Sequence, residues 1–269
     1  MRRLARILLG ALAAATAAGC ANDFLPASTL NDLRVLAIVA DPLEVGPADA
    51  TTLRAELWVP PGAALTSAEW TFCPISAGSV AGYACAVPRC EVPLAPAADG
   101  SVTASPGALA LQCLASAGGG VPVGPLPEVV ETVFRLRVGT DQGQRREAVL
   151  QIPLHPAGPP ADANLPPVFR SVESGGVRVY PPPGGAPPAL AAGAVLPVRV
   201  VLDPASAQPY MDAAGVPRVE TLTVSYYTTN GRFADDRSTG IDVSSGLAGP
   251  SRPAPPPAAE VRLAARHPR

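Results

Sequence analysis

The 269-residue sequence contains no lysine, few aromatic residues and only two histidines, His155 and His267. All twenty basic residues are arginines, and with abundant alanine and proline this indicates the coding bias of a GC-rich genome. A serine or cysteine nucleophile needs a neighbouring general base, usually a histidine, and two isolated histidines offer few such bases. No nucleophile elbow, His-Glu-x-x-His pair or phosphate-binding loop is present either. These absences predict a protein that is not an enzyme and that needs no cofactor.

Long hydrophobic runs are also missing, and the most apolar stretch is Ile7 to Ala18 near the start of the chain. Its twelve residues fall short of the roughly 20 that a membrane-spanning helix needs. Three arginines precede it and small residues follow it, ending in Gly19 and Cys20, which is the layout of a secretory leader. With a cysteine at this place, the segment resembles a bacterial lipoprotein leader with its lipobox.

The resemblance implies that the leader is cleaved after Gly19 and that Cys20 carries a diacylglycerol with palmitate-type chains. The protein would then be held at a membrane of the cell envelope through this anchor. Ala21 replaces the Asp that often retains such proteins at the inner membrane, which favours the outer membrane. An ordinary secretory signal, cleaved near Ala18 and leaving Cys20 free, is the alternative.

Without residues 1–19 the chain has 250 residues, enough for two ordinary domains. The leader holds three arginines and no acid, so the remainder carries 17 arginines against 22 acidic residues, a net charge of −5. An acidic body argues against a nucleic-acid partner.

Thirty-four prolines and 25 glycines separate short alternating or β-branched runs. Because proline interrupts helices and is excluded from central strands, this spacing predicts an all-β protein of the sandwich type. Strands are expected at residues 33–40, 52–59, 68–73, 131–138, 148–152, 168–172, 177–180, 195–202 and 220–229, with Asp141-Gln142-Gly143-Gln144 and Asn230-Gly231 as hairpin turns. Trp70 and Phe72 share a strand face and are expected in the core, whereas residues 74–127 are expected to be rich in loops.

Four cysteines remain besides Cys20, and an even number in an exported protein predicts two disulfides. Proximity favours the pairs Cys85–Cys90 and Cys73–Cys113. A zinc site is the alternative, but the spacings of 12, 5 and 23 residues lack a Cys-x-x-Cys pair or an adjacent histidine.

The domain prediction is a signal peptide at 1–19, a lipidated tether at 20–30, a β-sandwich at 31–155, a Pro-rich linker at 156–165 and a second β-domain at 166–269 with a Pro-rich basic tail. In both domains an opening strand precedes a Pro-rich turn, a long strand and a later aromatic strand. Glu69-Trp70-Thr71-Phe72 and Val224-Ser225-Tyr226-Tyr227 are counterparts. This order resembles tandem immunoglobulin-like domains of surface lipoproteins from GC-rich soil bacteria, although antibody-type cysteines do not flank Trp70. Whether the second domain is complete stays open.

The predicted role is non-catalytic: binding, or a structural part such as a spacer or assembly component with an envelope protein as partner. Carbohydrate binding is the alternative, with Tyr83, Tyr180 and Tyr210 as the loop-adjacent aromatics, and a hydrolase is the least favoured reading. The acidic loop 235–242 carries oxygen ligands of the kind calcium takes but lacks an EF-hand pattern, so no metal is predicted.

Overall fold

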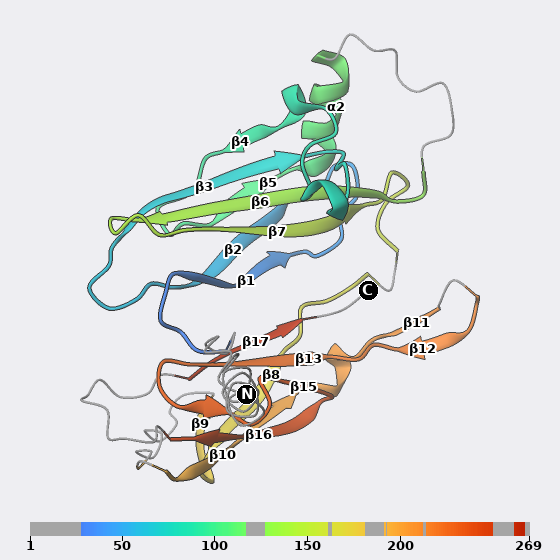
Figure 1. Cartoon of the computed structure of the whole chain (residues 1–269). Coiled ribbons are helices and arrows are strands. Elements are labelled where there is room, and N and C mark those ends of the chain that lie inside the picture. The colour runs from blue at the N-terminus through green and yellow to red at the C-terminus, as the bar shows by residue number, and fades with distance from the viewer. Residues whose placement is uncertain are drawn as a thin grey trace, which may run out of the picture.

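A computed structural model describes residues 28–116, 127–160, 163–180, 191, 193–211, 214–249 and 261–266 (Figure 1). These residues fold into two β-sandwiches and one α-helix. About half of the described residues lie in antiparallel sheets, which confirms the all-β prediction. The leader, Gly19 and Cys20 lie outside the described residues. So do the Pro-rich stretches 181–190 and 250–260.

The first sandwich packs a three-stranded sheet against a four-stranded sheet. The smaller sheet has the order β1-β2-β5 and the larger the order β4-β3-β6-β7. The turn Asp141-Gln142-Gly143-Gln144 joins β6 to β7 as a hairpin, as predicted. The strands are β1 (Arg34–Asp41), β2 (Thr51–Trp58), β3 (Leu65–Cys73), β4 (Val92–Leu94), β5 (Val102–Ala104), β6 (Val130–Thr140) and β7 (Arg145–Leu154).

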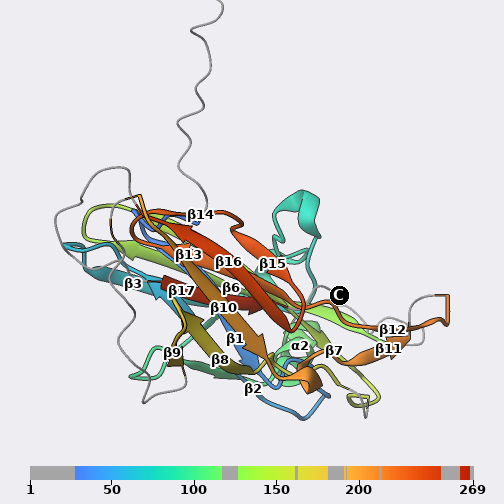
Figure 2. The same cartoon turned by 90° about the horizontal axis from the view of Figure 1, so that it is seen from below.

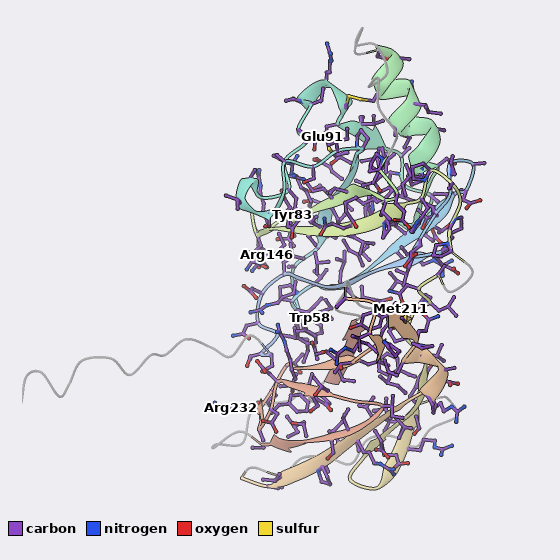
Figure 3. The ribbon with its side chains drawn as sticks, turned by 90° about the vertical axis from the view of Figure 1, so that its right-hand side faces the viewer. Trp58, Tyr83, Glu91, Arg146, Met211 and Arg232 are labelled. Atoms are coloured by element: carbon purple, nitrogen blue, oxygen red, sulfur yellow. A yellow bond between two sulfur atoms is a disulfide. The ribbon has the colours of Figure 1, made fainter. Side chains whose placement is uncertain are left out.

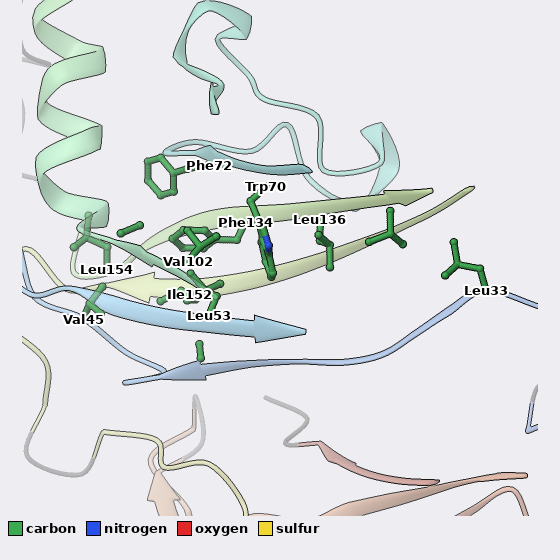
Figure 4. Packing of buried hydrophobic residues seen from close by; sticks show 13 residues of the cluster. Leu33, Val45, Leu53, Trp70, Phe72, Val102, Phe134, Leu136, Ile152 and Leu154 are labelled. Atoms are coloured by element: carbon green, nitrogen blue, oxygen red, sulfur yellow. The ribbon is translucent and has the colours of Figure 1, made fainter. Parts of the chain in front are cut away.

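The core of this sandwich follows from the alternation of each strand. Trp70 is 2% exposed, and Phe72 and Phe134 are fully buried with ring centroids 5.1 Å apart (Figure 4). The predicted core role of Trp70 and Phe72 is thereby confirmed. Leu136 and Val138 continue the same face of β6, so one side of the strand is apolar while the other carries arginines.

The second sandwich pairs sheet β14-β16-β10-β8-β9 with sheet β15-β13-β17. Strands β11 (Pro209–Met211) and β12 (Pro217–Val219) form a separate ribbon that extends beyond both sandwiches (Figure 1, Figure 2). The other strands are β8 (Phe169–Ser174), β9 (Val177–Tyr180), β10 (Val195–Leu202), β13 (Thr223–Thr228), β14 (Arg232–Phe233), β15 (Arg237–Thr239), β16 (Asp242–Ala248) and β17 (Val261–Arg266).

Asn230-Gly231 does not form the predicted hairpin. Gly231 has the positive φ of 82° that such a turn favours, but β14 pairs with β16 in the opposite sheet instead of with β13. The chain therefore crosses the core at this turn, and Phe233 packs against Tyr226 with ring centroids 5.2 Å apart. Turn chemistry predicts the reversal of the chain but not which sheet receives the next strand.

The region 74–127, expected to be loop, contains the helix α2 (Pro106–Ser116). Pro106 occupies the first turn, where its missing N–H costs nothing, and the N–H of Leu109 donates to the carbonyl of Ser105. A Cβ on Gly107 would collide with the backbone of Pro47, so only glycine permits this contact. Short 3₁₀ turns accompany the loops at η1 (Ser79–Ala81), η2 (Pro88–Cys90) and η3 (Pro204–Ser206).

The two sandwiches are joined by the segment that precedes β1. Residues 28–30, expected in the tether, run parallel to the end of β13. The Leu30 N–H donates to the Thr228 carbonyl and the Thr228 N–H donates to the Ser28 carbonyl, both at 2.8 Å. Leu30, Leu36 and Trp58 form a buried cluster that also contacts Tyr227 of β13, and Figure 3 shows Trp58 between the two sandwiches.

The linker is held at both of its ends. The buried Glu44 carboxylate lies 3.0 Å from Nε2 of His155 and accepts a hydrogen bond from the Asn164 N–H at 3.2 Å. On the side of the second sandwich, the Leu165 N–H donates to Gln208 Oε1 at 2.7 Å and the Val168 N–H to Ser206 Oγ at 2.9 Å. The linker thus contacts both sandwiches through specific hydrogen bonds.

Candidate functional site

The outer face of the β3-β6-β7 sheet carries rows of charged residues. Register places Glu69, Arg137 and Glu147 side by side on three adjacent strands. Arg137 Nε donates to Glu147 Oε2 at 2.9 Å, while Arg135 donates to the other carboxylate oxygen at 3.0 Å. Alternation makes this face polar because the opposite face of the same strands fills the core.

The next row borders a hollow. Ser67, Gly139 and Arg145 lie opposite one another, and a Cβ on Gly139 would stand 2.8 Å from Ser67 Oγ. The hollow has a volume of about 400 Å³. The residues that line it are Ser67, Glu69, Arg137, Val138, Arg145, Arg146 and Glu147.

Two of the charges around this hollow form no ion pair within the described part of the chain. Glu147 pairs with Arg135 and Arg137, and Arg146 pairs with Asp32, whereas Arg145 and Glu69 remain unpaired. A hydrogen bond to Glu147 raises the pKa of Arg137 above its ordinary value. The hollow therefore presents one available cation and one available carboxylate beside a hydroxyl.

The cysteines form two disulfides, as predicted, but in different pairs. Cys73 is joined to Cys85 with Cα atoms 5.5 Å apart, and Cys90 to Cys113 with Cα atoms 5.2 Å apart. The predicted Cys85–Cys90 and Cys73–Cys113 pairs are wrong. The loop after β3 returns through a bridge between Ser76 and Cys85, and α2 brings Cys113 to the 3₁₀ turn that holds Cys90.

The three tyrosines proposed for carbohydrate binding lie in different elements. Tyr83 is in the loop before η2, Tyr180 ends β9 with 45% of its surface exposed, and Tyr210 is in β11. The two ring contacts among the described residues are both in the cores and involve none of these three. The structure does not gather these aromatics into one platform.

The acidic loop 235–242 does not converge on a cation site. Asp242 accepts two hydrogen bonds from Arg199, at 2.8 and 2.6 Å, and this guanidinium lowers the pKa of Asp242. Within the described ranges, no three His, Cys, Asp or Glu side chains are grouped so that they could hold a metal. His155 contacts Glu44 at the linker, whereas His267 lies outside the described residues.

Gly19 and Cys20, the predicted cleavage and lipidation residues, precede the first described residue. In the part of the chain that is described, no helix combines the length and the apolar character that crossing a membrane requires. No family model, curated protein or solved structure matches the chain. The polar hollow on the first sandwich is the candidate site because its lining carries charges of both signs.

Proposed function

We propose that the protein is a lipid-anchored component of the cell envelope with a binding or structural role and two immunoglobulin-like domains. The leader supports the anchor: a basic start, a short apolar run and small residues before Cys20. Acyl chains on Cys20 would contribute about 0.8 kcal/mol for each buried CH₂. The absence of Asp after Cys20 favours the outer membrane.

The strand order supports the immunoglobulin-like assignment. In that fold, strands A, B and E share one sheet and C, F and G share the other. Taking the strands in chain order, β1-β2-β5 corresponds to A-B-E and β3-β6-β7 to C-F-G, with β4 added beside β3. The second sandwich repeats the first pattern as β8-β10-β16 and places β13 between β15 and β17. The aromatic strands β3 and β13 then occupy equivalent places.

The observation that carries the structural role is the bound segment at residues 28–30. Only seven residues lie between Cys20 and Ser28, and Ser28 is 2% exposed beside β13. An anchor on Cys20 would therefore hold both sandwiches through one short connection. Together with the linker hydrogen bonds, this favours a protein whose two domains hold a partner in a fixed position over one whose domains move independently.

Two measurements in cells test the proposal. Metabolic labelling with a palmitate analogue should mark the parent protein and leave Cys20→Ser unmarked, with the variant released from the membrane fraction. A labelled Cys20→Ser protein, or an unlabelled parent, would contradict the anchor.

Cross-linking in intact cells, followed by mass spectrometry, tests the role. Envelope proteins that are captured repeatedly, in amounts near that of the protein itself, would support a structural role. Retained glycan without protein would favour the carbohydrate alternative.

A further inference from the structure

Several turns meet at the end of the molecule from which residues 28–30 lead back toward Cys20. The Leu33 N–H donates to Gln144 Oε1 in the β6–β7 turn at 2.6 Å, and Asp32 pairs with Arg146 at the start of β7. The turn after β13 lies beside Ser28 through Thr228. We call this set, residues 28–34, 141–146 and 229–231, the tether end; Figure 1 shows these turns at the left of the molecule.

The length of chain before Ser28 limits how far the tether end can stand from an anchor. The eight residue-to-residue steps from Cys20 to Ser28 span at most about 28 Å, the length of the fully extended chain. If Cys20 carries the lipid, the tether end therefore lies within that distance of the bilayer surface. Two lining residues of the hollow, Ser67 and Arg145, lie in the row directly before the β6–β7 turn, so the hollow belongs to the same end.

The charges of the hollow select the chemistry of its ligand. Arg137 is engaged by Glu147 and Arg146 by Asp32, so neither adds much to the attraction of a simple anion. Arg145 and Glu69 form no ion pair in the described structure, and they carry opposite signs. A group with one phosphate and one ammonium would satisfy both, since phosphate accepts hydrogen bonds from guanidinium and an ammonium donates to carboxylate.

We propose that the hollow lined by Ser67, Glu69, Arg137, Arg145, Arg146 and Glu147 binds the phosphoethanolamine headgroup of a phospholipid in the membrane that carries the anchor. The phosphate lies against Arg145 and the ammonium against Glu69. A quaternary choline group fits less well because it has no N–H to donate to Glu69. The inference rests on the proposed lipid attachment at Cys20, which brings the tether end to the bilayer.

The test uses the full mature chain with Cys20→Ser, which carries no lipid. Its binding is compared on vesicles of equal parts phosphatidylethanolamine and phosphatidylcholine and on phosphatidylcholine alone. We expect tighter binding to the mixed vesicles. Arg145→Glu should weaken that binding by about tenfold or more, because it removes a charge-assisted hydrogen bond to the phosphate and puts a carboxylate in its place. Glu69→Gln should remove the preference for phosphatidylethanolamine.

Arg54→Glu is the matched control because it makes the same charge change on β2, on the other sheet of the sandwich. It should leave binding unchanged, and all variants should have the melting temperature of the parent. Equal binding to both vesicles, or equal losses for Arg54→Glu and Arg145→Glu, would overturn the proposal.

A second measurement uses the lipidated chain. Hydrogen exchange at residues 139–146 should slow in the mixed vesicles relative to phosphatidylcholine, and unchanged exchange would also count against the headgroup site. The intact mass of the extracted protein reports the lipid on Cys20 separately, so failure of the anchor and failure of the headgroup site are distinguishable.

Discussion

Leu36 offers a direct test of the contact between the two sandwiches. It lies on the outer face of the β1-β2-β5 sheet, where a single sandwich would expose it, yet it is only 3% exposed because Leu30, Trp58 and Tyr227 surround it. Val39 on the same strand is 42% exposed. Leu36→Ala and Val39→Ala therefore form a matched pair that differs in contact with the second sandwich.

The size of the effect follows from the atoms removed. Leu→Ala deletes the equivalent of about three methylene groups, worth about 2.4 kcal/mol at 0.8 kcal/mol each. Buried Leu→Ala substitutions cost 2–5 kcal/mol in cores, and the sum for three methylene groups lies at the low end of that range. We expect Leu36→Ala to lower the free energy of unfolding by about 2 to 3 kcal/mol, and Val39→Ala by about 0.5 kcal/mol or less.

Urea unfolding monitored by tryptophan fluorescence measures this difference. The chain contains two tryptophans: Trp58 lies in the contact cluster and Trp70 in the first core, so the signal covers both regions. A separate early transition of Trp58 in Leu36→Ala would show that the contact opens before the cores. If the two variants lost the same stability, the outer face of β1 would be exposed in solution and the reasoning would fail.

Three further variants test individual polar contacts. Glu44→Ala removes the carboxylate that accepts a hydrogen bond from the Asn164 N–H, and it should lower the free energy of unfolding by about 1 to 3 kcal/mol. Proteases should then cleave the linker faster, and an unchanged cleavage rate would argue against this hydrogen bond. Burial raises the pKa of Tyr226, whose buried hydroxyl makes no hydrogen bond of good geometry, so Tyr226→Phe should change thermal stability by about 1 kcal/mol or less; a larger loss would reveal a partner. Burial opposes ionisation of Asp32, but Arg34 and Arg146 outweigh it and lower its pKa below 3.8. The ionised carboxylate therefore stabilises the folded protein above pH 3.8, and this stabilisation is lost as the pH falls further. In an acid-unfolding experiment, Asp32→Asn should lose less stability than the parent over that pH range.

The strands could be predicted because their signals are local. Val177–Tyr180 and Val195–Leu202 coincide with their predicted ranges, and β6 alternates as expected between core and solvent. The β6–β7 hairpin follows from a short turn between two alternating runs. Each of these features depends on neighbours in the sequence, which propensity and period describe well.

Features that depend on long-range contacts were missed. The helix α2 has a local start signal in Ser105-Pro106, but its place between a loop and a Pro/Gly-rich region favoured a loop prediction. Without that helix, proximity alone pairs Cys85 with Cys90. With it, Cys113 is carried to Cys90, and the two disulfides close loops of 12 and 23 residues. Cysteine pairing is thus decided by the fold around the cysteines and not by their spacing.

The contact between the sandwiches left a signal in the sequence. The alternation of β2 assigns Leu53, Ala55 and Leu57 to the core, which places Trp58 on the outward face. A tryptophan turned away from the core of its own sheet requires another surface to bury it, because aromatic side chains carry a large apolar area. Read this way, Trp58 predicts a covered face on the first sandwich. The cover itself, Tyr227 together with Leu30, required the pairing of residues 28–30 with β13, a contact that spans most of the chain.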